Sequence, residues 1–191
     1  MALPLPPTHP LTVREYAQLG EDTRGRTELQ EGSLVTSPSP SPNHMAVIAH
    51  LLLQLVPQLP AEFEALPDLD IDLDLVPGDQ PGSSRRPDLI VVQRSARRRV
   101  DVEGGLVKAS EVTVVVEIVS PGSRRIDNIV KRAEYADAGI PHYWIVDIDG
   151  PVSLVSCRLT EKFGYVDDAV ATGTFTTEQP FPVTLKLDEL R

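Results

Sequence analysis

The sequence predicts an α/β protein with a mixed β-sheet flanked by helices, an N-terminal hairpin and antiparallel strands near the C-terminal end. Two apolar, β-branched runs, 89–92 and 112–119, are typical of strands buried in the middle of a sheet. A helical pattern follows the second run and another β-rich run follows that helix, which is an order of elements typical of α/β folds. The chain has 191 residues, enough for a sizeable core, and we expect residues 1–191 to form one domain.

The composition is that of an ordinary globular protein, with 24% charged and 41% apolar residues. The single cysteine, Cys157, excludes an internal disulfide. Because the N-terminal residues also lack the pattern of a signal peptide, we expect a cytoplasmic protein. The longest apolar segment, 46–56, is too short to cross a bilayer, so we expect no membrane association.

The charge is unevenly distributed along the chain. The net charge is −10, but residues 84–132 contain eleven Lys or Arg and six Asp or Glu, a balance of +5, which leaves −15 for the remainder. A basic region on an acidic protein suits an enzyme that meets a polyanion at one site. The alternative is that the arginine-rich run 94–99 is a solvated loop.

Before the first buried strand, local patterns predict a series of short elements. Thr12 and Glu15 have the spacing of a capping box, and Asn43 is a candidate N-cap for an apolar helical pattern. Alternating Leu or Ile and Asp predicts a half-buried strand with one acidic face. The expected elements are a loose proline-rich arm (1–11), a helix (13–19), a hairpin turning at 31–32 (27–31 and 33–37), a helix (43–59) and the alternating strand (69–76).

After the second buried strand, a helix is predicted over 126–138, with Gly139 as its C-terminal stop. A β-rich run at 142–148 completes the expected core, which covers about residues 43–149. Short antiparallel strands are expected after it, at 152–157, 163–168, 170–176 and 182–187.

Each buried strand carries a carboxylate that burial makes costly. Asp88 opens the first strand, and Glu117 lies between Val116 and Ile118 in the second. Phosphodiester hydrolysis uses a hard cation held by oxygen ligands, together with a positive group near the scissile phosphate. Asp88, Glu117 and the carbonyl of Ile118 are candidate ligands, and Lys131 on the following helix is the candidate positive group. The alternative is a structural ion pair between Glu117 and Lys131.

These residues resemble the PD-(D/E)XK nuclease superfamily. Pro87-Asp88 is followed by Glu117 on the next strand, but Val119 stands where the usual lysine would be, two residues after the glutamate. Some branches of the superfamily carry the lysine on the following helix, and Lys131 fits that variant.

A longer stretch is similar to the signature of the Uma2 family of restriction-type endonucleases. It reads V-E-I-V-S-P-G-S-R-R-I-D-N-I-V-K-R-A-E-Y-A-D-A-G-I-P-H-Y-W-I-V-D over residues 116–147. T-E-L-Q-E-G-S-L-V at 27–35 and S-P-S-P-N-H at 39–44 also match that family, so the resemblance covers roughly residues 11–187.

The resemblance implies a restriction-endonuclease-like core, a Mg²⁺-dependent nuclease (with Mn²⁺ as the substitute), DNA as substrate and a homodimer. It also implies supporting roles for Glu28 and His44 near the metal or phosphate. We expect four arginines to approach the phosphates: Arg85, Arg86, Arg124 and Arg125. The alternative function is a non-catalytic module of the same fold that binds nucleic acid or protein and keeps the acid and lysine as a structural ion pair.

Overall fold

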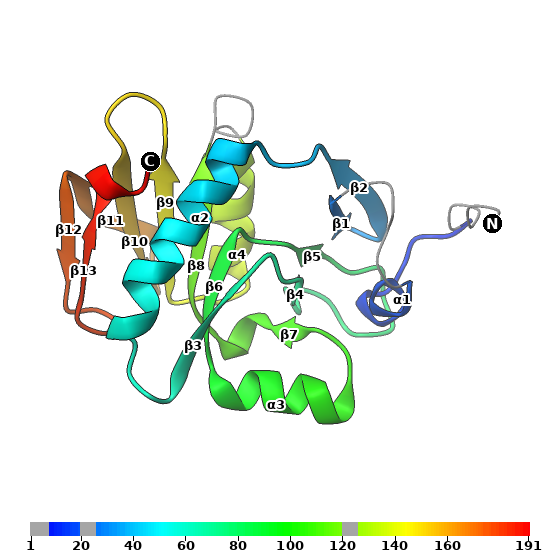
Figure 1. The fold of residues 1–191 in the computed structure, drawn as a ribbon. Helices are drawn as coiled ribbons and strands as arrows, with labels where there is room; N and C mark the ends of the chain where they lie inside the picture. Colours follow the sequence, from blue (N-terminus) through cyan, green and yellow to red (C-terminus); the bar gives the residue numbers. More distant parts are fainter. Residues whose placement is uncertain (1–7, 20–25, 120–125) are drawn as a thin grey trace.

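The computed structural model describes residues 8–19, 26–119 and 126–191 and confirms the predicted α/β class (Figure 1). Its largest sheet has six strands in the order β11-β10-β9-β8-β6-β3. The β8–β9 pair is parallel and the other pairs are antiparallel, so the sheet is mixed as expected. The strands are β3 (Phe63–Pro67), β6 (Leu89–Gln93), β8 (Val112–Val119), β9 (His142–Asp147), β10 (Ser153–Thr160) and β11 (Gly164–Thr172).

A second sheet, with the order β2-β1-β5-β4-β7, lies beside the first, and a two-stranded sheet is formed by β12 and β13 (Figure 1). Their strands are β1 (Arg26–Gln30), β2 (Ser33–Ser37), β4 (Ile71–Asp72), β5 (Ser84–Arg85), β7 (Val107–Lys108), β12 (Thr174–Thr177) and β13 (Val183–Lys186). The helices are α1 (Val13–Gln18), α2 (Pro42–Leu55), α3 (Arg94–Glu103) and α4 (Arg132–Asp137), with a π-helical segment η3 (Ile126–Lys131) before α4 and short 3₁₀ turns η1 (Val56–Gln58), η2 (Ala109–Glu111) and η4 (Leu187–Glu189).

The six-stranded sheet is covered on both faces, which explains the near-continuous apolar sequence of its central strands. Helix α2 and the β12–β13 pair pack on one face, where Val114, Val116 and Ile118 of β8 lie in their core. On the other face, Val115 and Val119 of the same strand pack with Tyr135 of α4. The alternation of a β-strand therefore directs Glu117 to the α4 face.

Several local predictions are confirmed. The Thr12 side chain accepts a hydrogen bond from the Glu15 amide, and the Glu15 carboxylate accepts one from the Thr12 amide, so the capping box of α1 is formed. Strands β1 and β2 form the hairpin, and Glu31 and Gly32 at its turn both have positive φ, as a type I′ connection requires. Gly139, with φ of 76°, follows α4 as the expected stop.

Two predictions about chain conformation are wrong. The alternating run 69–76 forms only the two-residue strand β4, because Asp68 and Asp74 adopt left-handed φ values of 53° and 51° that interrupt an extended chain. The arginine-rich run 94–99 is not a loop but the first part of helix α3, in which Ala96 is buried and most arginines remain accessible.

Three smaller differences concern termini and an added strand. Ser41, and not Asn43, caps α2, and its side chain accepts from the His44 amide. Strand β3 was not expected and adds an edge strand beside β6. Leu11, at the end of the segment expected to be a loose arm, is buried against Tyr16.

Candidate active site

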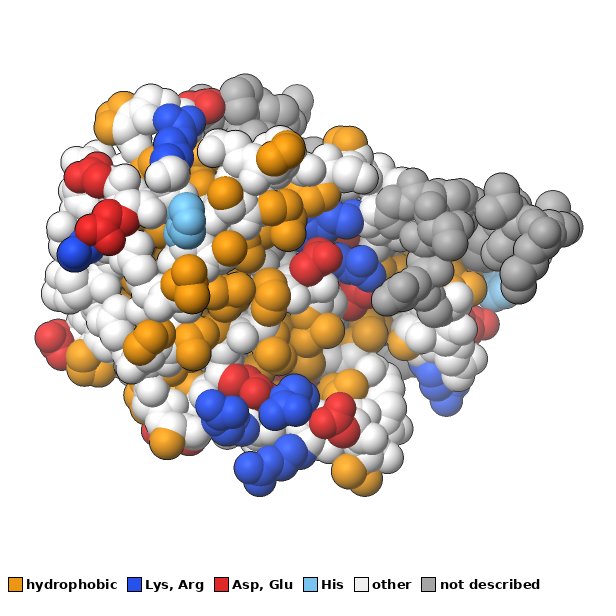
Figure 2. All heavy atoms as spheres, in the orientation of Figure 1, with side chains coloured by type: hydrophobic (Ala, Val, Ile, Leu, Met, Phe, Trp, Pro, Cys, Tyr) orange, Lys and Arg blue, Asp and Glu red, His pale blue; other side chains and the backbone are white. Residues whose placement is uncertain are grey.

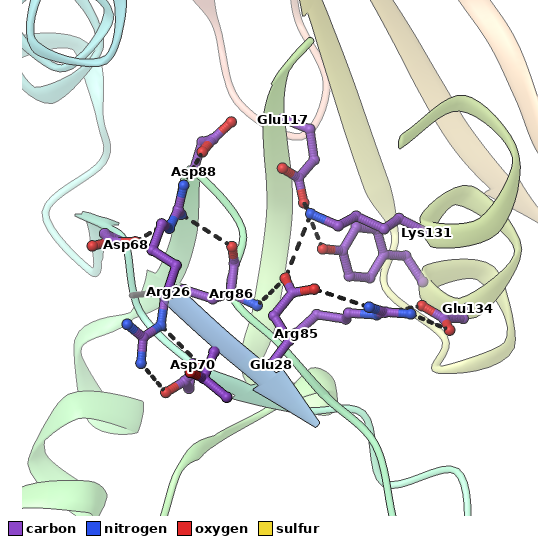
Figure 3. Close-up of polar contacts among 12 residues, drawn as sticks. Arg26, Glu28, Asp68, Asp70, Arg85, Arg86, Asp88, Glu117, Lys131 and Glu134 are labelled. Atoms are coloured by element: carbon purple, nitrogen blue, oxygen red, sulfur yellow. Dashed lines mark hydrogen bonds and ion pairs between the residues drawn. The ribbon is translucent and has the colours of Figure 1, made fainter. Parts of the chain in front are cut away.

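Asp88 and Glu117 lie opposite one another on neighbouring strands. In the antiparallel pairing of β6 with β8, Leu89 is the partner of Val116, so the next position places Asp88 beside Glu117. Directly opposed residues in such a pair point to the same face with Cβ atoms about 5 Å apart. The two residues are 4% and 2% exposed, so both are largely withdrawn from water. Figure 3 shows Glu117 directed towards Lys131 and Asp88 towards Arg26.

The Asp88 carboxylate is held by donors from three different elements. Its Oδ2 accepts a hydrogen bond of 2.8 Å from the backbone N–H of Ile118. Its Oδ1 lies 2.9 Å from Nε2 of His44, in the first turn of α2, and 3.1 Å from Nη1 of Arg26, at the start of β1. Burial works against the charged form of Asp88, but these donors outweigh it and keep its pKa below the ordinary value. Asp88 is therefore an ionised carboxylate.

The Glu117 carboxylate meets the side chains of the helical segment that follows β8. Its Oε1 is 2.8 Å from Nζ of Lys131 and accepts a 2.7 Å hydrogen bond from the Tyr135 hydroxyl. Lys131 also lies 3.6 Å from Oε1 of Glu28, on β1, and is 8% exposed. The ammonium thus stands between two buried carboxylates, one from each of the larger sheets (Figure 3).

The spacing of residues along η3 and α4 explains this arrangement. Lys131, Glu134 and Tyr135 are separated by three and four positions, and such residues share one face of a helix. Lys131 and Tyr135 reach Glu117, while Glu134 accepts two hydrogen bonds of 2.7 Å from the Arg85 guanidinium. One helical face therefore completes the site with a cation, a hydroxyl and an acid.

Arg85 is placed differently from our expectation of a phosphate contact. Its side chain is 3% exposed and bridges Glu134 to Glu28, with Nη1 2.9 Å from Oε2 of Glu28. Burial opposes the charge, but the bonds to Glu134 and Glu28 outweigh it and raise the pKa of Arg85. Because its guanidinium is enclosed by two carboxylates, Arg85 fixes Glu28 and α4 in place and does not present a surface to a phosphate.

Arg86 is closer to the surface than Arg85. Its guanidinium forms a two-point contact with Asp70, at 3.0 and 2.6 Å, and its side chain is 25% exposed. The backbone N–H of Arg86 donates to Oε1 of Glu28, so the β5 chain also helps to orient that glutamate. Of the other two expected phosphate contacts, Arg124 and Arg125 lie outside the described residues.

The structure brings together five of the expected residues: Glu28, His44, Asp88, Glu117 and Lys131. Ile118 joins them through its N–H, which fixes Asp88. Further charged or polar partners were not among the expected site residues; they are Arg26, Asp68, Asp70, Glu134 and Tyr135. Two signals were available for some of them: Arg26 and Glu28 alternate on one strand, and Glu134 and Tyr135 follow Lys131 at helical spacing.

The donor set is compatible with a magnesium-type ion. Within the described parts of the chain, no group of three or more His, Cys, Asp or Glu is arranged to hold a metal. Mg²⁺ needs no such group, since it is commonly bound by one or two carboxylates with waters and substrate phosphates. Asp88 and Glu117, side by side with the Ile118 backbone next to them, offer that hard-oxygen chemistry.

A mixed sheet that carries two adjacent buried carboxylates, with a lysine on the helix behind them, is a nuclease-like arrangement. Comparison with solved structures agrees on the fold: the crystal structure of a putative nuclease of the DUF820 group from Anabaena variabilis superposes with a TM-score of 0.67 at 18% identity, covering 95% of this chain and 97% of that one. The protein belongs to the Uma2 family, described as "Putative restriction endonuclease", whose model matches residues 13–188. Comparison with curated proteins found no match.

Proposed function

We propose that this protein is a divalent-metal-dependent endonuclease that hydrolyses phosphodiester bonds in DNA. The observation that carries the proposal is the cross-strand pair of buried, adjacent carboxylates, Asp88 and Glu117, with the Lys131 ammonium 2.8 Å from one of them. Two carboxylates on neighbouring strands offer oxygen ligands to a divalent ion, which is the kind of cation that phosphodiester hydrolysis uses. Membership of the Uma2 family supports a nuclease.

In this proposal Asp88, Glu117 and the Ile118 carbonyl hold Mg²⁺, with Mn²⁺ as a substitute. The bound ion would polarise the scissile phosphate and lower the pKa of a water molecule. Asp88 is kept ionised and oriented by His44 and by the Ile118 N–H, so the ligand geometry is fixed before substrate arrives. Tyr135 orients Glu117 in the same way from the other side.

Lys131 is the candidate for the group that positions the attacking water or stabilises charge on the phosphate. Its ammonium can exchange contact with Glu117 for contact with a substrate oxygen, because Glu28 remains beside it. Glu28 in turn is anchored by Arg85 and the Arg86 N–H. Its role in the proposal is to support Lys131, in keeping with the supporting role expected from the sequence.

Arg86, Arg124 and Arg125 are the proposed contacts to DNA phosphates, whereas Arg85 is reassigned to the framework of the site. Figure 2 shows basic and acidic side chains close together in the region between α2 and the β1–β2 hairpin, which is where a phosphate would approach. Acidic neighbours there reduce non-specific attraction to DNA, so binding depends on the metal as well as on arginines.

Plasmid nicking tests the proposal. Wild-type protein is incubated with supercoiled DNA in Mg²⁺ or Mn²⁺, with chelator as the metal-free control, and compared with Asp88→Asn and Asp101→Asn. The second variant removes the same charge from a side chain that is 64% exposed on α3. We expect metal-dependent nicking that falls about 100-fold or more in Asp88→Asn, the scale typical of lost transition-state stabilisation, and is unchanged in Asp101→Asn. Equal nicking by both variants would contradict the proposal.

A second candidate function is favoured by the same ion pair. Lys131 and Glu117 can serve as a structural pair in a non-catalytic module of this fold that binds nucleic acid or protein. Such a module needs no divalent ion, so DNA binding that is unaffected by chelator, without nicking, would support it.

Assembly and location remain proposals. The described helices include none with the length and apolarity of a membrane span. We propose a cytoplasmic homodimer, for which exposed Met45 and Leu53 of α2 and Val56 directly after it offer a contact surface. Light scattering coupled to size exclusion would give the molar mass in solution.

A further inference from the structure

Arg26 joins the carboxylates of Asp68 and Asp88. Its Nη2 lies 2.7 Å from Oδ1 of Asp68, and its Nη1 lies 3.1 Å from Oδ1 of Asp88. Because Arg26 and Glu28 are two positions apart on β1, both side chains extend from the same face of the strand towards the site (Figure 3). The site therefore contains a fixed cation in direct contact with a proposed metal ligand.

The guanidinium is permanently charged in this position. Burial disfavours the charge, but Asp88, Asp68 and Glu117 outweigh that effect and raise the pKa of Arg26. Arginine is in any case protonated throughout the working range of proteins. Any second cation brought to Asp88 must therefore overcome repulsion from Arg26 or displace it.

The contacts of Asp88 show where that competition occurs. Each carboxylate oxygen has about two lone-pair sites, and Oδ1 already receives Arg26 and His44. Oδ2 receives the Ile118 N–H, which the β-sheet holds in place. A divalent ion on Oδ1 must replace a donor, and one on Oδ2 lies a few ångströms from the guanidinium.

We propose that Arg26 competes with the divalent cation for Asp88, and that Asp68 retains Arg26 when the cation binds. The inference rests on the proposed metal-dependent function. The Asp68 side chain is 49% exposed and that of Asp88 is 5% exposed, so Asp68 offers Arg26 a partner nearer to solvent. A guanidinium that leaves Asp88 but stays on Asp68 remains beside the metal, where it contacts a phosphate of the DNA.

Mn²⁺ titration calorimetry without DNA tests the competition directly. Arg26→Ala removes the competing charge, and we expect the Kd for Mn²⁺ to fall about fivefold or more, within the usual range of coupling between sites. Arg26→Lys keeps a cation that can pair with Asp88, so its Kd stays near the wild-type value. Arg158→Ala is the control for net charge. Arg158 lies opposite His142 in the β9–β10 pair, whereas Glu117 lies opposite Ile145 in the β8–β9 pair.

Asp68→Asn should act in the opposite direction. With Asp68 neutral, Arg26 is left with Asp88 as its charged partner, so Mn²⁺ competes less well and its Kd rises. In the double variant with Arg26→Ala, most of that rise should disappear, because the effect of Asp68 passes through Arg26. The single variant Asp68→Asn keeps Arg26 in place, so it still tests the competition if Arg26→Ala folds poorly.

DNA affinity should change in the opposite direction to Mn²⁺ affinity in Arg26→Ala. In Ca²⁺, fluorescence anisotropy with a short random-sequence duplex should show weaker binding by Arg26→Ala, although its metal affinity is higher. A structural role for Arg26 would instead weaken metal and DNA binding together, and that result would overturn the inference.

Two further outcomes separate this inference from the proposed function. If wild type binds Mn²⁺ and Arg26→Ala binds it with the same Kd, the competition is refuted while the metal site stands. If neither protein binds Mn²⁺, the proposed metal-dependent function fails, and the inference fails with it.

Discussion

Replacing Lys131 with methionine tests how the buried charges hold the site together. The substitution keeps the length of the side chain but removes the ammonium that stands 2.8 Å from Glu117 and 3.6 Å from Glu28. Breaking a buried ion pair by removing one partner typically costs 3–5 kcal/mol. Glu28 keeps Arg85 and Glu117 keeps the Tyr135 hydroxyl, so we expect the lower end, about 3 kcal/mol, at pH 7.

Urea unfolding measures this loss of unfolding free energy. For a chain of this size, a loss of about 3 kcal/mol corresponds to a fall in Tm of about 6–12 °C. Lys131 is among the groups that lower the pKa of Glu28 against the opposing effect of burial. A lowered pKa stabilises the folded state above the unfolded value of about 4.5 and ceases to do so as pH falls through the folded value. The difference between wild type and Lys131→Met should therefore be largest near neutral pH and narrow below about pH 4.5.

Lys162→Met, at an exposed position, serves as the matched control and should leave unfolding unchanged. A loss of unfolding free energy below about 1 kcal/mol for Lys131→Met at pH 7, or a loss that does not change with pH, would contradict this expectation. It would mean that the two carboxylates are solvated or neutral without the lysine.

Three other substitutions have defined outcomes. Arg85→Met should lower the unfolding free energy by about 3 kcal/mol in urea, because buried Glu28 and half-buried Glu134 both lose contact with its guanidinium; a change under 1 kcal/mol would contradict the framework role. The double variant Arg124→Ala, Arg125→Ala should reduce the slope of log DNA affinity against log salt by about 2, whereas an unchanged slope would exclude phosphate contacts by these residues. Trp144→Ala should cost about 3–5 kcal/mol, because Trp144 is 1% exposed in the core, and a normal urea midpoint would show that the core closes around the cavity.

The core of the site could be predicted because its signals are local. An acid inside an apolar strand, as at Glu117, violates the binary pattern of a buried element, and such violations concentrate at functional sites. Asp88 directly precedes β6, Glu117 lies on its sheet neighbour β8, and Lys131 lies on the helical segment that follows β8. Elements close in sequence therefore bring the three residues together.

The outer part of the site could not be predicted from local pattern, because it depends on non-local packing. Glu28 was expected from the family resemblance alone. Glu28 and Arg26 reach the core through the β1–β5 contact, whose single register pair is Leu29 with Ser84, 55 positions apart in sequence. The alternation of Arg26 and Glu28 on one strand indicates that they share a face, but it does not indicate which distant strand that face meets. The surroundings of Arg85 are non-local in the same way, since Glu134, which its guanidinium contacts, is 49 positions away in sequence.

The two wrong predictions about the fold also have specific physical causes. Helix α3 buries Ala96 but carries mostly polar side chains, so the apolar periodicity that reveals a helix is absent. The run 69–76 does alternate, but left-handed backbone at Asp68 and Asp74 limits it to two paired residues. An alternating apolar pattern predicts which side chains an extended chain would bury. It does not predict whether the chain stays extended.

The proposed function requires Asp88 and Glu117 to hold a divalent cation together. Titration of Mn²⁺ into wild type and Glu117→Ala by calorimetry, with plasmid nicking measured on the same samples, tests it most directly. We expect saturable binding and nicking in wild type, and loss of both in a folded Glu117→Ala protein. No binding by wild type, or binding and nicking that survive Glu117→Ala, would contradict it.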